Sequence, residues 1–418
     1  MSDPGASAAP SCDTPAAGPR PARLLSIDAA QALIASHIAA LPAETVPLGE
    51  AHGRFVAEDV AAVIDLPPFA SSAMDGYAVH AADTPARLRV VGESAAGSPF
   101  TGELGPGEAV VISTGAVVPA SADAIVPVEE IARDGDQVEV TTEIAPGAFV
   151  RAAGSDVERG ARILAAGTRL GPAQIGAAAA AGLDALSCRR RPRVAVLTTG
   201  SELRPPGHPL GAGEIYDANG PMLSAALRAT GAEVSTIPTV GDEEVAHRDA
   251  LREALEHDVV ISSGGVSMGT HDLVRSVGGE LGVREIFWKV ALRPGKPLAF
   301  GVRDTTLVFG LPGNPVSTLV CFELFVRPAL LALQGAPDAR PAFSAGRLAT
   351  AVERNPQRDD LIRVQVTPDR TPVLTPLAGQ QSHQITVTAQ ADALALIPVG
   401  TGELPAGSDV AYLPLQRA

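Results

Sequence analysis

The feature of this sequence that most constrains its fold is a regular alternation of strand-like and helix-like segments from residue 193 to residue 335. Strand-like runs lie at 193–198, 233–239, 259–262 and 306–310, and segments with helical spacing lie after Asn219, over 243–256 and over 315–333. Strands and helices that alternate in this way are typical of right-handed βαβ units around a mostly parallel sheet. We therefore predict an α/β domain, with ligand-binding loops at the carboxyl ends of its strands.

The segments on either side of this domain have other patterns. Apolar residues follow helical spacing from Ser26, a candidate N-cap, until Pro42, and a second helix is predicted over 172–181. Short β-branched runs separated by Gly and Pro fill residues 56–150 and the chain after Gly335, which indicates two β-rich domains. At 418 residues the chain exceeds what one hydrophobic core usually holds, so several domains are expected.

The charge and composition exclude several classes of protein. A formal net charge of -15 repels polyanions, so we expect no nucleic-acid partner and no acidic membrane surface. Residues 1–23 are rich in Ala, Pro, Gly and Ser without the apolar core of a secretion signal, and are expected to be a disordered tail. The longest small-apolar stretch, 175–183, falls far short of the roughly 20 residues of a membrane helix. The three cysteines show no CxxC spacing, so a soluble protein of the reducing cytoplasm is expected.

Two glycine-rich loops follow predicted strands and precede helices. The first, residues 262–269 (SSGGVSMG), can direct backbone N–H groups and a helix N-terminus at an anion. The second, residues 310–315 (GLPGNP), places Asn314 at an N-cap and Pro315 at the first helical position. Either loop alone can equally be an ordinary connection between elements. Two of them at one sheet edge favour a binding site, with the candidate residues Ser263, Gly264, Gly265, Ser267, Pro312, Gly313 and Asn314.

A concentration of cations lies between these loops, in residues 289–297 (KVALRPGKP). It begins with Lys289, and its tight-turn residues would bring Arg293 close to Lys296. Two such cations suit an oxyanion or a phosphate. A surface hairpin with solvated charges is the alternative.

Four carboxylates form a further candidate set: Glu202, Asp217 and Asp242, which each follow a strand or precede a helix start, and Asp272, in the predicted helix after the first glycine-rich loop. N-capping or turn chemistry explains any one of the first three alone. Several carboxylates in one crevice would repel each other unless a cation joined them. Mg²⁺ prefers oxygen ligands and can bridge carboxylates to a substrate pyrophosphate, so it is the expected metal.

A further loop, residues 66–79 (LPPFASSAMDGYAV), combines a rigid lead-in, small residues and one acid, Asp75. The residues alone predict an ordered loop in which Asp75 is solvated or acts as a cap. They leave its purpose open.

Taken together, these segments resemble the molybdopterin molybdenumtransferase (MoeA) family. The matching motifs are SAMDGYA at 72–78, TGA at 114–116, TTGSEL at 198–203, SSGGVS at 262–267, PGKP at 294–297 and LPGNPVS at 311–317. Their order and spacing cover roughly residues 24 to 415. After the tail (1–23), the resemblance implies four domains: an elongated helical dimerisation domain (24–55 plus 151–190), an inserted β-rich domain (56–150), an α/β molybdopterin-binding domain (191–336) and a C-terminal β-barrel-like domain (337–418).

The resemblance also implies an activity, the last step of molybdenum cofactor biosynthesis. A homodimer would insert molybdate into adenylylated molybdopterin with release of AMP, receiving its substrate from a molybdopterin adenylyltransferase and serving molybdoenzyme apoproteins or their chaperones. The alternative is a molybdopterin-binding scaffold or carrier without this activity. A nucleotide-binding regulator would leave the inserted and C-terminal domains unexplained. The set that favours the enzyme is complete: Asp75, Asp242, Asp272, Lys289, Lys296 and Arg363.

Site roles follow from the same resemblance. Asp75 would act across the dimer interface, and Asp242 and Asp272 would position Mg²⁺ or the adenylate. Molybdate would meet Arg293, Lys296, Arg363 and Ser382. The 263–267 loop and the 312–314 turn would hold the pterin phosphate and the nucleotide, and Thr114, Glu202 and Asp217 complete the predicted substrate-binding set. Arg293 is a departure, since the family pattern often has Lys there, and the guanidinium changes the contact geometry.

Overall fold

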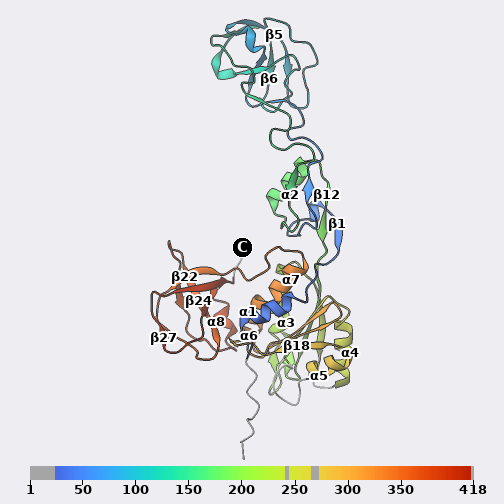
Figure 1. Ribbon diagram of the computed structural model, residues 1–418, viewed down its shortest axis with the longest axis vertical. Coiled ribbons are helices and arrows are strands. Elements are labelled where there is room, and N and C mark those ends of the chain that lie inside the picture. Colours follow the sequence, from blue (N-terminus) through green and yellow to red (C-terminus); the bar gives the residue numbers. More distant parts are fainter. Residues whose placement is uncertain (1–23, 241–243, 265–272, 416–418) are drawn as a thin grey trace, which may run out of the picture.

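The computed structural model of the chain describes residues 24–240, 244–264 and 273–415. The molecule is elongated (Figure 1). A β-rich region with β5 (Ala86–Ser94) and β6 (Glu108–Ile112) forms one end, and a narrower region with α2 (Pro172–Ala180) connects it to the bulky other end. The α/β sheet and the C-terminal β region lie together at that bulky end.

The α/β region is built on a sheet in which six described strands have the order β16-β13-β17-β21-β20-β18. The strands are β13 (Arg193–Thr199), β16 (Glu233–Val240), β17 (Val259–Ser263), β18 (Arg284–Trp288), β20 (Ala299–Arg303) and β21 (Thr306–Leu311). The first four in the sheet order pair in parallel, which confirms the α/β prediction. The last two are antiparallel. A tight hairpin joins β20 to β21, and Asp304 in its turn takes a positive φ of 52°.

Helices cover both faces of this sheet. They are α3 (Asn219–Ala229), α4 (Glu244–Ala254), α5 (Leu273–Glu280), α6 (Pro315–Cys321) and α7 (Arg327–Leu333), with a π-helical turn, Phe322–Val326, joining the last two. Pro315–Leu333 is the one stretch in the described part of the chain that is long and apolar enough to cross a membrane, but 72% of its most apolar window is buried inside the protein. Its apolar residues form the centre of the core beside β21.

The first helix, α1 (Ile27–Ala35), begins at the predicted N-cap, because Ser26 Oγ accepts a hydrogen bond from the Ala29 amide at 3.2 Å. It ends before the predicted stop at Pro42. The side chains of Ser36 and His37 each hydrogen-bond the Leu33 carbonyl at 2.8 Å and compete with continued helical pairing. Ile27, Ala30 and Ile34 of α1 pack into the α/β core.

The inserted region contains a second sheet, with the described order β7-β4-β6-β5-β9-β8. Its other strands are β4 (Gly76–Val79), β7 (Ala124–Pro127), β8 (Ile131–Asp134) and β9 (Gln137–Val140). The connecting region pairs β1 (Ala43–Pro47) with β12 (Ala185–Arg189) and β2 (Val60–Ala61) with β11 (Arg162–Leu164). Its small core includes Val46, Leu164, Ala178 and Leu186, so residues from both sides of the insertion share it.

The C-terminal strands close into a barrel. They are β22 (Ser344–Leu348), β24 (Asp359–Thr367), β25 (Val373–Pro376), β26 (Ala393–Ile397) and β28 (Asp409–Pro414), and the additional pairing of β24 with β26 completes the ring. A short strand from the α/β region, β19 (Leu292–Arg293), pairs in parallel with the start of β24. Leu361, Leu394 and Leu413 of the barrel belong to the same core cluster as the α/β strands. The two regions are therefore joined by both main-chain pairing and apolar packing.

The remaining elements are short. They are β3 (Ser71–Ser72), β10 (Val150–Arg151), β14 (Leu203–Arg204), β15 (Ile215–Tyr216), β23 (Val352–Glu353), β27 (Glu403–Leu404), α8 (Ile385–Thr388) and the 3-10 turns Leu48–Glu50, Ala81–Asp83 and Val128–Glu130.

Candidate functional site

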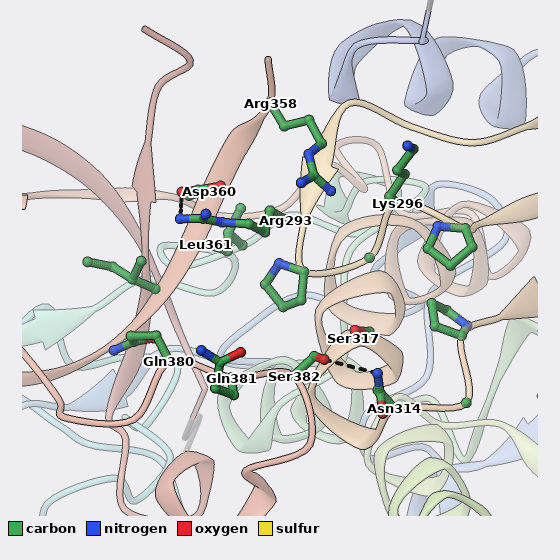
Figure 2. A pocket seen from close by; sticks show the side chains of 16 residues that line it. Arg293, Lys296, Asn314, Ser317, Arg358, Asp360, Leu361, Gln380, Gln381 and Ser382 are labelled. Carbon is green, nitrogen blue, oxygen red and sulfur yellow. Dashed lines mark hydrogen bonds and ion pairs between the residues drawn. The ribbon is translucent and has the colours of Figure 1, made fainter. Parts of the chain in front are cut away.

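A cavity of about 620 Å³ lies between the loops at the carboxyl edge of the α/β sheet and the barrel. Six residues of the predicted site line it: Arg293, Lys296, Pro312, Gly313, Asn314 and Ser382. Figure 2 shows the cations on one side of this cavity and the Asn314 to Ser382 contact on the other. Residues from the α/β region and the barrel thus meet in one place.

Arg293 forms an ion pair with Asp360, drawn as a dashed line in Figure 2. The pairing of β19 with β24 sets Arg293 opposite Asp360. Asp360 is only 1% exposed, whereas 53% of the Arg293 side chain is exposed. Burial raises the pKa of Asp360, and the Arg293 guanidinium opposes that rise. Arg293 therefore reaches the cavity with its charge already balanced by a carboxylate.

Lys296 lies on a tightly packed turn. Gly295 in this turn has a φ of +122°, and a Cβ built there would lie 2.9 Å from Cys321 Sγ on α6. The Lys296 carbonyl accepts a hydrogen bond of 3.0 Å from the Val290 amide. This packing holds the backbone that carries Lys296 at the cavity wall.

Asn314 begins α6 as predicted, with Pro315 in the first turn. Its side chain does not cap the helix but donates a hydrogen bond of 3.0 Å to Ser382 Oγ. The Val316 amide donates to the Ser382 carbonyl at 3.1 Å. The start of α6 is therefore fixed to the barrel loop that carries Ser382.

Arg363 lies behind the cavity wall and is 1% exposed. Its guanidinium donates to the carbonyls of Gly379 at 2.9 Å and Gln381 at 3.0 Å, and to Gln380 Oε1 at 3.2 Å. Burial lowers the pKa of Arg363. Since Gln380 and Gln381 line the cavity, Arg363 shapes the wall from behind and does not line it in the described structure.

The carboxyl edge of the sheet adds a second group of polar residues next to the cavity. Asn219 Nδ2 donates to Ser263 Oγ at 2.9 Å and to the Gly313 carbonyl at 2.7 Å, which joins the two glycine-rich loops. Within the described chain, two buried oxygens here have no hydrogen-bond partner, Asn219 Oδ1 and Thr199 Oγ1. Gly264 has a φ of +94°, and a Cβ there would lie 2.6 Å from the Thr199 carbonyl oxygen. Only glycine allows this close approach of the two strands.

Two predicted carboxylates lie on the α/β region outside the cavity. Asp217 Oδ1 accepts a hydrogen bond of 2.9 Å from the Gly220 amide in the first turn of α3, which is capping chemistry. Glu202 is exposed in the turn before β14.

Asp75 and Thr114 lie in the inserted region, beside β4 and β6 at the opposite end of the molecule from the cavity (Figure 1). Asp75 Oδ1 accepts hydrogen bonds from the Thr114 amide at 2.6 Å and from Thr114 Oγ1 at 3.0 Å. These bonds, the backbone one above all, lower the pKa of Asp75. The structure therefore brings these two separately predicted site residues together, with Asp75 exposed and its ionised form favoured.

Lys289 does not line the cavity. Its residue has a left-handed φ of 77°, and its Nζ lies 3.5 Å from the ring centroid of Trp288, a cation–π contact. The predicted residues Asp242, Asp272, Gly265 and Ser267 lie outside the described residues. Within the described ranges, no group of three or more His, Cys, Asp or Glu side chains is placed to hold a metal ion.

Comparison with known proteins accounts for the whole domain order. The sequence matches the models of the MoeA N-terminal region (domain I and II) over residues 25–182, of a probable molybdopterin binding domain over 195–332, and of the MoeA C-terminal region (domain IV) over 345–415. It is 40% identical over 402 residues to molybdopterin molybdenumtransferase 2 of Mycobacterium tuberculosis (strain CDC 1551 / Oshkosh), an alignment that covers 92% of this chain and 98% of the relative. The chain belongs to the MoeA family.

Two further relatives agree with this assignment. A molybdopterin molybdenumtransferase of Haemophilus influenzae is 39% identical over 308 residues, which cover 72% of this chain and 76% of that one. The crystal structure of the molybdopterin biosynthesis MoeA protein from Pyrococcus horikosii superposes with a TM-score of 0.82 at 34% identity, covering 95% of this chain and 100% of that chain. The MoeA fold thus extends over the described regions together.

Sequence reasoning missed several residues around the MoeA cavity: Asn219, Ser317, Arg358, Asp360, Gln380 and Gln381. The residues around Asn219 predict only a helix start, because Asn is common in turns and at caps and leaves no local sign of a bond to a distant loop. Arg358 and Asp360 stand in the charged run RDD at the start of β24. Such a run is typical of surface charge, and only the pairing with β19 places it beside the cavity.

Proposed function

We propose that this MoeA-family protein is a molybdopterin molybdenumtransferase, which inserts molybdate into adenylylated molybdopterin with release of AMP. The observation that carries the proposal is the cationic cavity between the sheet edge and the barrel, in a chain with a net charge of -15. A dianion repelled by the rest of the surface finds positive charge there. The sheet edge beside it offers open polar oxygens and a glycine backbone to the larger substrate.

The chemistry asks the protein for positioning and charge neutralisation. The two dithiolene thiols bind molybdenum while one oxo group of molybdate leaves as water with both thiol protons. One water then cleaves the phosphoanhydride, so that AMP leaves and the terminal phosphate stays on the pterin. Molybdenum keeps its oxidation state, and no protein nucleophile takes part. Lys296 reduces the repulsion between molybdate and the phosphates of the other substrate, and Arg293, balanced by Asp360, forms part of the cavity wall beside it.

Mg²⁺ is the proposed metal of this reaction. The available donors are oxygen atoms, which a hard cation prefers, because Asn219 Oδ1 and Thr199 Oγ1 are buried and have no hydrogen-bond partner among the described residues. Asp242 and Asp272, the proposed carboxylate ligands, lie outside the described residues. When bound, Mg²⁺ would supply positive charge to the phosphoanhydride.

We also propose a cytoplasmic homodimer in which Asp75 and Thr114 of one subunit complete the site of the other. This accounts for an ordered, ionised Asp75 at the far end of the same subunit. A molybdopterin adenylyltransferase is the proposed donor, and molybdoenzyme apoproteins or their chaperones are the proposed acceptors. We propose no nucleic-acid partner and no membrane partner for this protein.

The deciding experiment supplies purified protein with adenylylated molybdopterin, molybdate and Mg²⁺, and measures AMP release together with reconstitution of a molybdoenzyme apoprotein. Molybdate-dependent AMP release is the expected result. Binding of the pterin substrate without AMP release would instead support the scaffold or carrier, which no observation on this chain favours.

A further inference from the structure

We propose that Arg358 is a direct ligand of the oxyanion and that, together with Lys296, it supplies the uncompensated positive charge of the cavity. Arg293 then acts as a residue balanced and positioned by Asp360. This inference rests on the proposed function for the identity of the oxyanion, molybdate, but its geometry stands on the cavity alone.

The charges that line the cavity show why the three cations are not equivalent. Among the described residues that line the cavity, Arg293, Lys296 and Arg358 face one carboxylate, Asp360, which leaves a formal surplus of two positive charges. Asp360 forms its ion pair with Arg293, whereas Arg358 acts on Asp360 through a weaker, longer-range charge interaction. An ion-paired guanidinium has part of its donor set occupied and attracts a second anion less strongly. Lys296 and Arg358 therefore carry the surplus.

The Arg358 side chain is placed to use its charge. In Figure 2 its guanidinium points from the segment before β24 into the space between Arg293 and Lys296. No hydrogen bond or ion pair occupies this guanidinium within the described part of the chain. The residue is half-buried, so the charge is partly shielded from water without being neutralised.

The backbone at Arg358 is held on both sides. Asn355, which is 9% exposed, accepts hydrogen bonds through Oδ1 from the amides of Gln357 at 2.9 Å and Arg358 at 3.2 Å. The next amide, that of Asp359, donates to the Ala291 carbonyl at 3.1 Å. Only the side chain of Arg358 needs to order when the anion binds, which favours tight and selective binding.

A second observation also points to a ligand in this place. Asp360 is nearly fully buried and lines the cavity, yet its Oδ1 has no hydrogen-bond partner among the described residues. A buried carboxylate oxygen without a donor is costly unless a ligand or water supplies one. The cavity thus presents one open acceptor beside two open cations. This matches a reaction in which an oxyanion binds and a protonated group, a thiol or the departing water, passes next to it.

The test compares Arg358→Gln with Arg370→Gln, which removes an exposed arginine from the same barrel outside the cavity. Molybdate alone is the probe, and its affinity for the full chain is measured by isothermal titration calorimetry. Loss of a charge-assisted contact should weaken molybdate binding by about 10-fold or more in Arg358→Gln. Arg358→Lys should recover part of the affinity, and Arg370→Gln should bind like the wild type. Matching melting temperatures of the variants control for folding.

Two outcomes overturn the inference: equal molybdate affinity in Arg358→Gln and the wild type, or no molybdate binding by the wild type at all. The separate AMP-release assay keeps the proposed function distinct. If the wild type bound molybdate through Arg358 but never released AMP, the proposed transferase activity would be wrong and Arg358 would still be an oxyanion ligand. If the wild type released AMP and Arg358→Gln had the same molybdate affinity and molybdate KM as the wild type, the transferase would stand and Arg358 would not be an oxyanion ligand.

Discussion

The Asn314 side chain donates a 3.0 Å hydrogen bond to Ser382 Oγ, a residue 68 positions later in the chain. This bond connects the first residue before α6 to a loop of the barrel, and the Val316 amide reinforces it through the Ser382 carbonyl. The two halves of the cavity wall are thus held in register by groups that also face the cavity.

Ser382→Ala removes the acceptor while the backbone bond remains. We expect the free energy of unfolding to fall by about 1 kcal/mol, the usual net value of one hydrogen bond. We expect a larger relative rise in the KM for molybdate, because the barrel loop that carries residue 382 would be held less firmly against α6. Urea unfolding and steady-state AMP release measure the two. A variant with unchanged stability and unchanged KM would show that the contact is incidental.

Arg363→Met tests whether this arginine acts from behind the cavity wall. The change leaves the carbonyls of Gly379 and Gln381 and the side chain of Gln380 without their donor, so unfolding should become easier by about 3 kcal/mol. Arg370→Met, at an exposed position, is the control and should change stability by less than about 0.5 kcal/mol. If Arg363→Met kept its stability but lost molybdate binding, Arg363 would contact the anion directly, as the family resemblance implied.

Gly264→Ala places a Cβ 2.6 Å from the Thr199 carbonyl oxygen, at a φ of +94° that L side chains rarely adopt. The carboxyl edge of the sheet must shift to make room for this Cβ. Because preorganised sites lose function on small displacements, affinity for adenylylated molybdopterin should fall by about 10-fold or more. Gly176→Ala in α2 has open space around it and should be neutral or stabilising by up to about 1 kcal/mol. Equal substrate affinity in the two variants would refute a binding role for this edge.

The ionisation of Asp258 should make the free energy of unfolding depend on pH. Burial acts to raise its pKa, but the paired bonds from Arg190 at 2.6 and 2.7 Å and the bond from the Arg193 amide at 2.8 Å outweigh it, and the pKa is lowered. A lowered folded-state pKa gives stability that is present above the ordinary value of 3.8 and is lost as the pH falls below it. Asp258→Asn should cost about 2 to 3 kcal/mol near neutral pH.

The difference between wild type and Asp258→Asn should then shrink as urea unfolding is repeated at lower pH, from about pH 7 to about pH 3. A difference that stayed constant over this range would mean that ionisation of Asp258 contributes nothing to stability.

Asp75 and Lys296 can be tested as partners across subunits. Homodimers of Asp75→Ala and of Lys296→Ala should each lose AMP release. In a mixed dimer one composite site carries neither substitution and the other carries both. A mixed dimer should therefore release AMP at about half the rate of a wild-type dimer. Mixed dimers without activity, formed in proven one-to-one ratio, would show that both residues serve the same subunit's site.

Much of the fold could be predicted because each element carries local signals. Gly231 and Gly182 end helices at left-handed φ values of 88° and 89°, and Asn314 and Ser26 begin them, so these boundaries are nearly correct. The end of α1 was wrong by several residues because the Leu33 carbonyl bonds to the side chains of Ser36 and His37. That competition depends on side-chain geometry and leaves no periodic signal.

The site was less accessible to sequence reasoning. Arg293 and Lys296 stand close in the chain, so their proximity in the cavity could be predicted. Asp360 and Arg358 come from another domain, and only the pairing of β19 with β24 sets them beside Arg293. The position of Asp217 before a helix fits both a ligand site and a cap. The bond from the Gly220 amide gives it a capping role, and its part in substrate binding stays a prediction.

The pairing of Leu292 and Arg293 with Asp359 and Asp360 has a consequence for recombining domains between members of the family. The barrel takes its extra edge strand from a segment that precedes it by more than fifty residues of sequence, counted from residue 292 to residue 344. A chimera cut at the chain boundary near Gly335 would therefore divide one hydrogen-bonded sheet between two parents. A barrel can be exchanged as a cassette only if residues 290–297 travel with it.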